Sequence, residues 1–267
     1  MSKESGSESS RVILGGRILR ERIGRGETLW GFLLTLPDPG ILELAADWDW
    51  FWVDSQHGQL SYDTLLHCVR VADLVGVPAI VRAAGHDYSQ IGPILDTGAA
   101  GVMVPMLHNA GQAKAVVKAA RFAPLGQRSF GGRRVIDRGG FKYSLTANQD
   151  TILLGQIESV EGLANVEQIA AVEGLDGLFF GPSDYAIDRG IPGESMSAPR
   201  MWEAVEKIAQ ACKSQGKVAA TLMCAPETAA RLVKLGYQMV AGAIDSELLR
   251  GGLAEARVNL RRAEQKT

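Results

Sequence analysis

The chain has 267 residues, of which 46% are hydrophobic and 22% charged, a balance typical of an ordinary soluble globular protein rather than a disordered one. Its 28 Lys and Arg residues against 30 Asp and Glu residues give a net charge of −2, which provides no broad positive field for nucleic acid or an anionic membrane. A small-molecule partner is therefore expected, with no nucleic acid and no membrane.

The cysteines and the N-terminus favour a cytoplasmic protein. Three widely spaced cysteines, Cys68, Cys212 and Cys224, form no CxxC pair, which argues against a disulfide framework or a thiolate zinc site. No apolar run approaches the ~20 residues of a membrane span, and the first ten residues are polar where a signal peptide is apolar. Residues 1–10 are predicted to be a disordered tail and residues 11–267 a single domain.

Short, almost wholly apolar segments recur along the chain, as expected of strands buried on both faces of a parallel sheet. Eight are predicted, in chain order Leu29–Thr35, Trp50–Asp54, Pro78–Arg82, Gly101–Pro105, Ile152–Glu158, Gly177–Phe180, Val218–Met223 and Gln238–Ala243. Segments with helical periodicity lie between them: Pro39–Ala46, Tyr62–Leu74, Ala110–Arg121, Val160–Val172, Pro199–Gln215 and Pro226–Leu235. Repeated strand–helix units with no linker between halves predict an α/β fold, a closed (β/α)8 TIM barrel.

Two segments depart from a minimal barrel. Phe122–Asn148 is too long and too rich in Gly and Arg for an ordinary connection, and we interpret it as a functional excursion. The C-terminal segment Asp245–Lys266 carries an apolar stripe that includes Leu249 and Leu253. It is either the last barrel helix or a helix that packs on, or is swapped with, a neighbouring subunit.

Polar residues gather where predicted strands end, and in a barrel these carboxyl ends build the active site. Glu158 and Asp184 follow the adjacent fifth and sixth strands. Two carboxylates with open positions beside them suit Mg²⁺, Mn²⁺ or Co²⁺ better than a closed zinc site. Gln156 points to the same side as Glu158 and is expected to hold a metal-bound water or a substrate oxygen. The alternative is a carboxylate pair buried against Arg82 as a charge network.

Groups that recognise anions are predicted beside these carboxylates. Arg82 ends the third strand, and its fork of donors suits a 2-oxo carboxylate and the oxyanion formed at C2. A salt bridge from Arg82 to Asp54 or Glu158 is equally plausible. The backbone N–H groups of Ser183 and Asp184 open the next helix and are placed to receive a carboxylate.

His57 is the candidate general acid and base, because an imidazole titrates near neutral pH and Asp54, three residues earlier, is placed to orient or charge it. The other histidines, His67, His86 and His108, lack a carboxylate so placed and are interpreted as structural. Lys217 begins the seventh strand, at the wrong end of the barrel for Schiff-base chemistry, which favours a metal over an imine.

Several motifs in this order resemble one known family. They are FWVDSQHG (51–58), VPAIVR (77–82), ILDTGAAGVMVPM (94–106), RFAPLGQRSFG (121–131), LLGQIES (153–159) and VEGLDGLFFGPSDYA (172–186). From about Gly31 to Leu249 the chain resembles the metal-dependent class II pyruvate aldolases of the HpcH/HpaI type, which include 4-hydroxy-2-oxo-heptanedioate aldolase and macrophomate synthase.

The resemblance implies a (β/α)8 barrel that forms hexamers, as trimers of dimers, by exchanging C-terminal helices. It also implies a divalent metal on Glu158 and Asp184, Arg82 on the enolate oxygen, and His57 with Asp54 in proton transfer. One position departs from the family pattern DxEH: Gln56 stands where members have Glu, and an amide cannot accept a proton. The basic residues Arg133 and Arg134 are also unusual, and they suit either an acidic tail on the aldehyde or a solvated or inter-subunit role.

The sequence thus predicts a carbon–carbon lyase, an aldolase that cleaves or forms 4-hydroxy-2-oxo acids through a metal-bound pyruvate enolate and an aldehyde. Two alternatives stay open: an acyl-CoA lyase of the citryl- or malyl-CoA type, and a barrel that binds an oxo acid without turnover.

Overall fold

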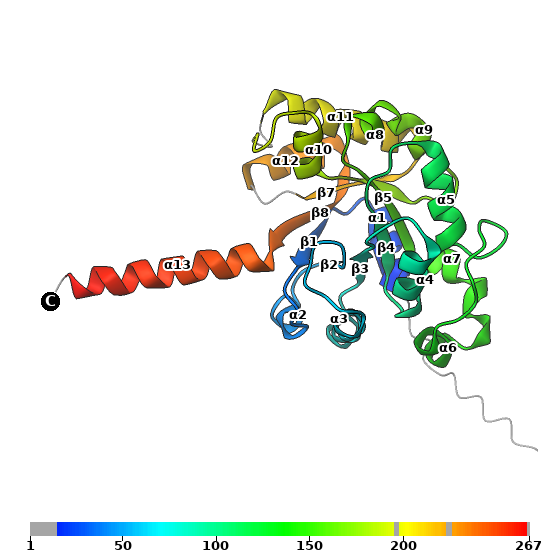
Figure 1. Ribbon diagram of the computed structural model, residues 1–267, viewed down its shortest axis with the longest axis horizontal. Coiled ribbons are helices and arrows are strands. Elements are labelled where there is room, and N and C mark those ends of the chain that lie inside the picture. Colours follow the sequence, from blue (N-terminus) through cyan, green and yellow to red (C-terminus); the bar gives the residue numbers. More distant parts are fainter. Residues whose placement is uncertain (1–14, 195–197, 223–225, 266–267) are drawn as a thin grey trace, which may run out of the picture.

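A computed structural model describes residues 15–194, 198–222 and 226–265. Eight parallel strands pair in chain order and close into a barrel, as predicted (Figure 1). The strands are β1 (Leu29–Leu34), β2 (Trp50–Asp54), β3 (Ala79–Arg82), β4 (Gly101–Val104), β5 (Ile152–Ile157), β6 (Gly177–Phe180), β7 (Val218–Leu222) and β8 (Tyr237–Ile244). Every predicted strand is found within two residues of its expected bounds; Met223, at the end of the seventh, lies outside the described residues.

One helix precedes the first strand, helices lie between successive strands around the barrel, and a last helix follows the eighth strand. They are α1 (Gly15–Gly24), α2 (Gly40–Leu44), α3 (Tyr62–Val75), α4 (Tyr88–Asp96), α5 (Ala110–Ala120), α6 (Arg133–Gly139), the 3-10 helix η1 (Phe141–Leu145), α7 (Ala147–Asp150), α8 (Val160–Ala164), α9 (Val166–Ala170), α10 (Pro182–Asp188), α11 (Pro199–Ser214), α12 (Pro226–Leu235) and α13 (Asp245–Glu264). No helix within the described ranges is long and apolar enough to span a membrane. The predicted tail, residues 1–10, lies outside the described residues.

Local signals explain several boundaries. The Ser61 hydroxyl accepts a hydrogen bond from the Thr64 N–H at the start of α3, and Gly76, with a φ of 76°, ends that helix in the left-handed region. The predicted helix Val160–Val172 is instead two short helices, α8 and α9, that meet at Asn165. The Asn165 side chain donates to the His108 carbonyl, which ties this break to the loop after β4.

The hydrophobic core has two layers. Inward-facing side chains fill the barrel, among them Trp50, Trp52 and Phe179, and a larger layer fills the space between the strands and the helices. Above the inner apolar layer lies the end of the barrel where the carboxyl ends of the strands meet, which we call the mouth.

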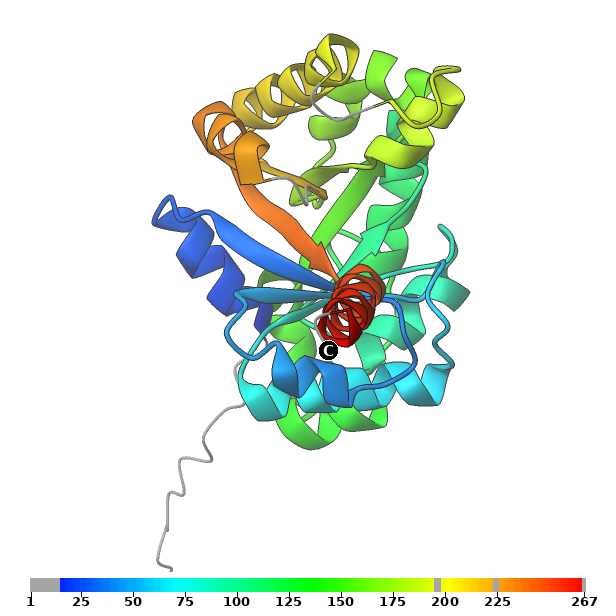
Figure 2. The same cartoon turned by 90° about the vertical axis from the view of Figure 1, so that its left-hand side faces the viewer.

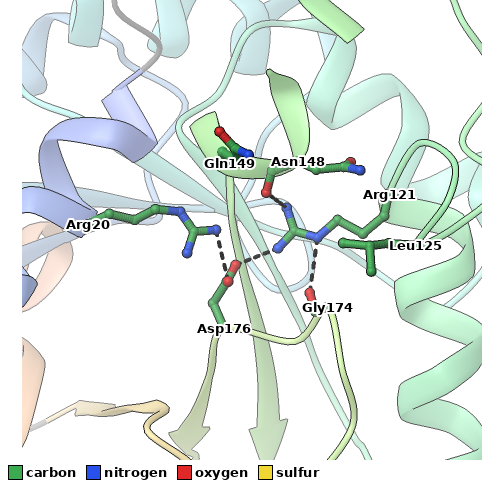
Figure 3. Close-up of a pocket in the computed structure, with 7 residues that line it drawn as sticks. All are labelled: Arg20, Arg121, Leu125, Asn148, Gln149, Gly174 and Asp176. Carbon is green, nitrogen blue, oxygen red and sulfur yellow. Dashed lines mark hydrogen bonds and ion pairs between the residues drawn. The ribbon is translucent and has the colours of Figure 1, made fainter. Parts of the chain in front are cut away.

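Arginines close the opposite, N-terminal end of the barrel. Arg121 donates to the carbonyls of Gly174, Asn148 and Thr151, and it pairs with Asp176 at 2.5 Å (Figure 3). Arg20 of α1 pairs with the same aspartate at 2.8 Å. This network fixes α1 and the end of the excursion against the barrel.

The C-terminal helix leaves the barrel. Asp245 is buried and accepts hydrogen bonds from the backbone of Thr35 and Leu36, which fixes the start of α13 to the end of β1. From residue 247 to the end of its described length every residue is exposed, and the helix projects far from the barrel (Figure 1). Figure 2 views it nearly end-on.

Candidate active site

The mouth brings together the polar residues predicted at strand ends. Asp54 from β2, Arg82 from β3, and Gln156 and Glu158 from β5 and its end are all at least 94% buried, with exposed fractions of 1, 6, 2 and 2%. Asp184 enters from the first turn of α10, after β6, and is half-buried. Because all strands are parallel, their carboxyl ends deliver these groups to the same end of the barrel.

Glu158 is held by one backbone donor. Its Oε1 accepts the Met106 N–H at 2.7 Å, while its Oε2 is buried and receives no hydrogen bond from the residues that the structure describes. Burial raises the pKa of Glu158 to about 7, and the nearby Asp184 carboxyl adds to this effect against the Met106 N–H and the charge of Arg82. The site therefore presents two adjacent carboxyls, one of which is costly to ionise in the absence of a cation.

The residues around these carboxyls fit a divalent cation. Gln156 Oε1 is, like Glu158 Oε2, a buried oxygen without a hydrogen-bond donor. Gly181 leaves room at this point, since a Cβ there would lie 2.5 Å from Glu158 Oε2. Hard oxygen donors of this kind suit Mg²⁺ or Mn²⁺. The described residues contain no group of three or more His, Cys, Asp or Glu side chains that could hold a metal ion.

Arg82 is fixed by two contacts. Its Nε and Nη2 donate to the Asp54 carboxylate at 2.9 and 2.5 Å, and its guanidinium lies over the Trp52 ring, 4.8 Å from the centroid. The Nη1 group makes no hydrogen bond to any described residue and so keeps donors for a ligand. The salt bridge between Arg82 and Asp54, one of the alternatives considered from sequence, is present.

Asp54 makes no hydrogen bond to the His57 ring among the described residues, so its expected part in orienting that ring stays a prediction. Asp54 Oδ1 accepts the backbone N–H groups of Gln56 and His57, at 3.0 and 3.4 Å, and both of its carboxylate oxygens also accept from Arg82. The turn after β2 directs main-chain N–H groups toward Asp54, and His57 is exposed. His57 lies at the mouth without a carboxylate partner among the described residues.

The long segment between α5 and β5, residues 122–148, lies away from the mouth. Arg134 donates to the carbonyl of Thr97, just before β4, and Arg134 and Arg138 both pair with Asp73 near the end of α3. These contacts place the segment near the N-terminal ends of the strands. Within one chain, Arg133 and Arg134 therefore cannot bind a substrate at the mouth, which corrects that expectation.

Two features of the site were not predicted. Met106 has a φ of 55°, in the left-handed region that methionine rarely adopts, and this conformation accompanies the N–H bond to Glu158. Trp52 carries a buried indole N–H with no acceptor. Met106 is neither glycine nor asparagine, the residues that commonly signal a left-handed conformation. Trp52 resembles the other apolar residues of its strand.

The chain is similar to several known proteins. The family model described as HpcH/HpaI aldolase/citrate lyase matches residues 42–251. The chain is 36% identical over 225 residues to the 4-hydroxy-2-oxovalerate aldolase of Novosphingobium aromaticivorans (83% of this chain, 86% of the relative). It is 36% identical over 245 residues to the hydroxypyruvate/pyruvate aldolase of Pseudomonas aeruginosa (88% and 90%). The crystal structure of an HpcH/HpaI aldolase from Desulfitobacterium hafniense DCB-2 is similar, with a TM-score of 0.85 at 30% identity (91% and 96%).

Proposed function

Because the chain belongs to the HpcH/HpaI aldolase/citrate lyase family and its relatives are named aldolases, it is a carbon–carbon lyase, and we propose that it cleaves or forms 4-hydroxy-2-oxo acids with a divalent metal. The bond in question joins C3 and C4, and its cleavage gives pyruvate and an aldehyde. The observation that carries the proposal is the pair of adjacent carboxyls, Glu158 and Asp184, beside a buried arginine at the mouth.

Glu158 and Asp184 are the residues that would hold the metal. Glu158 Oε2 is buried without a donor, and a cation there would offset the cost of ionising two neighbouring carboxyls. A bound divalent cation supplies positive charge that stabilises developing oxygen anions. Mg²⁺, Mn²⁺ and Co²⁺ all suit this oxygen-rich donor set.

Arg82 and Gln156 would bind the oxo acid. Arg82 keeps its Nη1 donors for the substrate carboxylate and for the oxygen at C2, while Asp54 and Trp52 hold the guanidinium in place. Gln156 Nε2 is an additional donor beside Glu158. The N–H groups of Ser183 and Asp184, in the first turn of α10, lack helical partners and complete the anion-binding side.

His57 would move the protons. In the cleavage direction it takes the proton from the C4 hydroxyl, the electrons of the C3–C4 bond pass to C3 and the C2 oxygen, and the aldehyde departs. Arg82 stabilises the resulting enolate, which then takes a proton at C3 to give pyruvate. Gln56 can hydrogen-bond the aldehyde or a water but cannot share the proton.

Metal binding tests the ligand assignment. Titration of Mn²⁺ into the protein, followed by the EPR signal of free Mn²⁺, is expected to show a site that Glu158→Ala abolishes and Glu161→Ala keeps, because Glu161 is exposed on α8. Equal affinity in wild type and Glu158→Ala would overturn the assignment. Substrate class is tested in parallel: cleavage of 4-hydroxy-2-oxovalerate supports the aldolase, whereas turnover of malyl- or citryl-CoA alone would replace it with an acyl-CoA lyase.

A further inference from the structure

One peptide group at the mouth is hydrogen-bonded at both ends. The carbonyl of Pro105 lies 2.7 Å from His86 Nε2, and the N–H of the same peptide, that of Met106, lies 2.7 Å from Glu158 Oε1. A single amide plane therefore joins a histidine in the loop after β3 to the carboxyl of Glu158 after β5. Neither His86 nor this peptide has a part in the function proposed above.

The peptide is held in a conformation that the chain does not favour by itself. Met106 has a φ of 55°, and Leu107, the next residue, donates its N–H to the Gln156 carbonyl at 3.0 Å. A left-handed conformation is unfavourable for a residue with a Cβ, so the turn depends on its surrounding contacts. The His86 contact holds the turn from the loop that follows β3.

His86 is suited to this task. The Pro105 carbonyl can only accept, so Nε2 of His86 carries the proton and donates it. A hydrogen bond to the carbonyl of an amide polarises the group and strengthens its N–H as a donor. His86 is half-buried and no acidic side chain pairs with it among the described residues, so its ring is oriented by this carbonyl.

We propose that His86 is a positioning residue that acts through the Pro105–Met106 peptide to orient the Glu158 carboxylate. This rests on the proposed function, in which Glu158 is a metal ligand. Hydrogen-bonding partners behind a metal ligand commonly set its orientation, and their loss weakens metal affinity by about 10- to 100-fold.

The experiment compares His86→Ala, which removes the donor, with His86→Gln, whose amide places a donor near the position of Nε2. His67→Ala is the control, because His67 is exposed on α3. Binding of Mn²⁺ alone is measured by EPR, together with hydrogen exchange of the Met106 amide by NMR or mass spectrometry. We expect His86→Ala to bind Mn²⁺ roughly tenfold more weakly or worse and to exchange faster at Met106, and His86→Gln and His67→Ala to match wild type.

Two results would overturn the inference: wild-type affinity and exchange in His86→Ala, or a His86→Gln variant as impaired as His86→Ala. Failure of the proposed function gives a different result. In that case wild type shows no Mn²⁺ site that Glu158→Ala abolishes. In that event the exchange of the Met106 amide alone decides whether His86 fixes the turn.

Discussion

Glu158 is a carboxyl of the mouth whose ionisation the fold opposes. Burial, reinforced by Asp184, raises its pKa from 4.5 to about 7 in the metal-free protein. Between pH 4.5 and about pH 7, folding is therefore accompanied by uptake of a proton at Glu158. The stabilisation from this protonation is fully present below pH 4.5 and is lost as the pH rises through about 7.

The metal-free protein should accordingly lose stability between pH 5 and pH 8 through Glu158. In urea unfolding with EDTA, the free energy of unfolding of wild type should fall by about 2–3 kcal/mol more over this range than that of Glu158→Gln, which cannot ionise. The exposed control Glu161→Gln should follow wild type. Parallel pH profiles for wild type and Glu158→Gln would contradict the raised pKa.

The geometry of Arg82 matters as well as its charge. Arg82→Lys keeps a cation near buried Asp54 but loses the two-pronged contact and the stacking on Trp52, so kcat/KM should fall about 100-fold. Arg17→Lys is the control, because Arg17 also donates to an aspartate through Nε and Nη2, both to Asp150 Oδ1, at the other end of the barrel. Steady-state kinetics on a cleavable oxo acid measures both, and a loss below threefold in Arg82→Lys would count against its role.

At the scale of elements, the strands and the residues at their ends were predictable, because buried parallel strands are apolar runs and their carboxyl ends share one end of the barrel. The contacts made by turns were not predictable from the sequence. Spacing alone suggested that Asp54 faces the His57 ring, whereas the turn after β2 presents main-chain N–H groups.

Helix α1 was not predicted because it opens with Gly15 and Gly16, which are poor helix formers. Gly16 is needed at this position because a Cβ would lie 2.2 Å from the Asp150 carbonyl oxygen.

The contacts between α1, α5 and α7 depend on Arg121, which is almost fully buried. Arg121→Met should lower the free energy of unfolding by about 3–5 kcal/mol, because it leaves buried carbonyls and part of the Asp176 charge unpaired. Urea unfolding measures this. The exposed pair of Arg133 with Asp137 supplies the control, and Arg133→Met should change stability by less than about 1 kcal/mol. Equal stability of the two variants would contradict this account of the N-terminal end.

At the scale of the whole molecule, α13 cannot be covered by its own barrel. Leu248, Leu249, Leu253, Val258 and Leu260 are 46–70% exposed on a helix that contacts the barrel only at its start. Such an apolar surface on a projecting helix is typical of an interface between subunits. We therefore expect a homo-oligomer, the hexamer implied by the resemblance.

Leu253→Glu should break this assembly, because it places a charge in the apolar stripe of α13. Light scattering coupled to size exclusion should report the hexamer mass for wild type and for Glu255→Gln, which changes another side of the helix, and a smaller species for Leu253→Glu. Circular dichroism should show that the barrel remains folded. An unchanged mass for Leu253→Glu, or a monomeric wild type, would exclude α13 as the interface.

The most direct test of the central claim is exchange of the pyruvate methyl protons in D₂O, followed by proton NMR. The account predicts exchange by wild type with Mg²⁺, Mn²⁺ or Co²⁺, none after EDTA, recovery when metal is returned, and loss in Glu158→Ala. Exchange at the same rate in EDTA, or no exchange with any of the three metals, would contradict a metal-dependent enolate mechanism at Glu158 and Asp184.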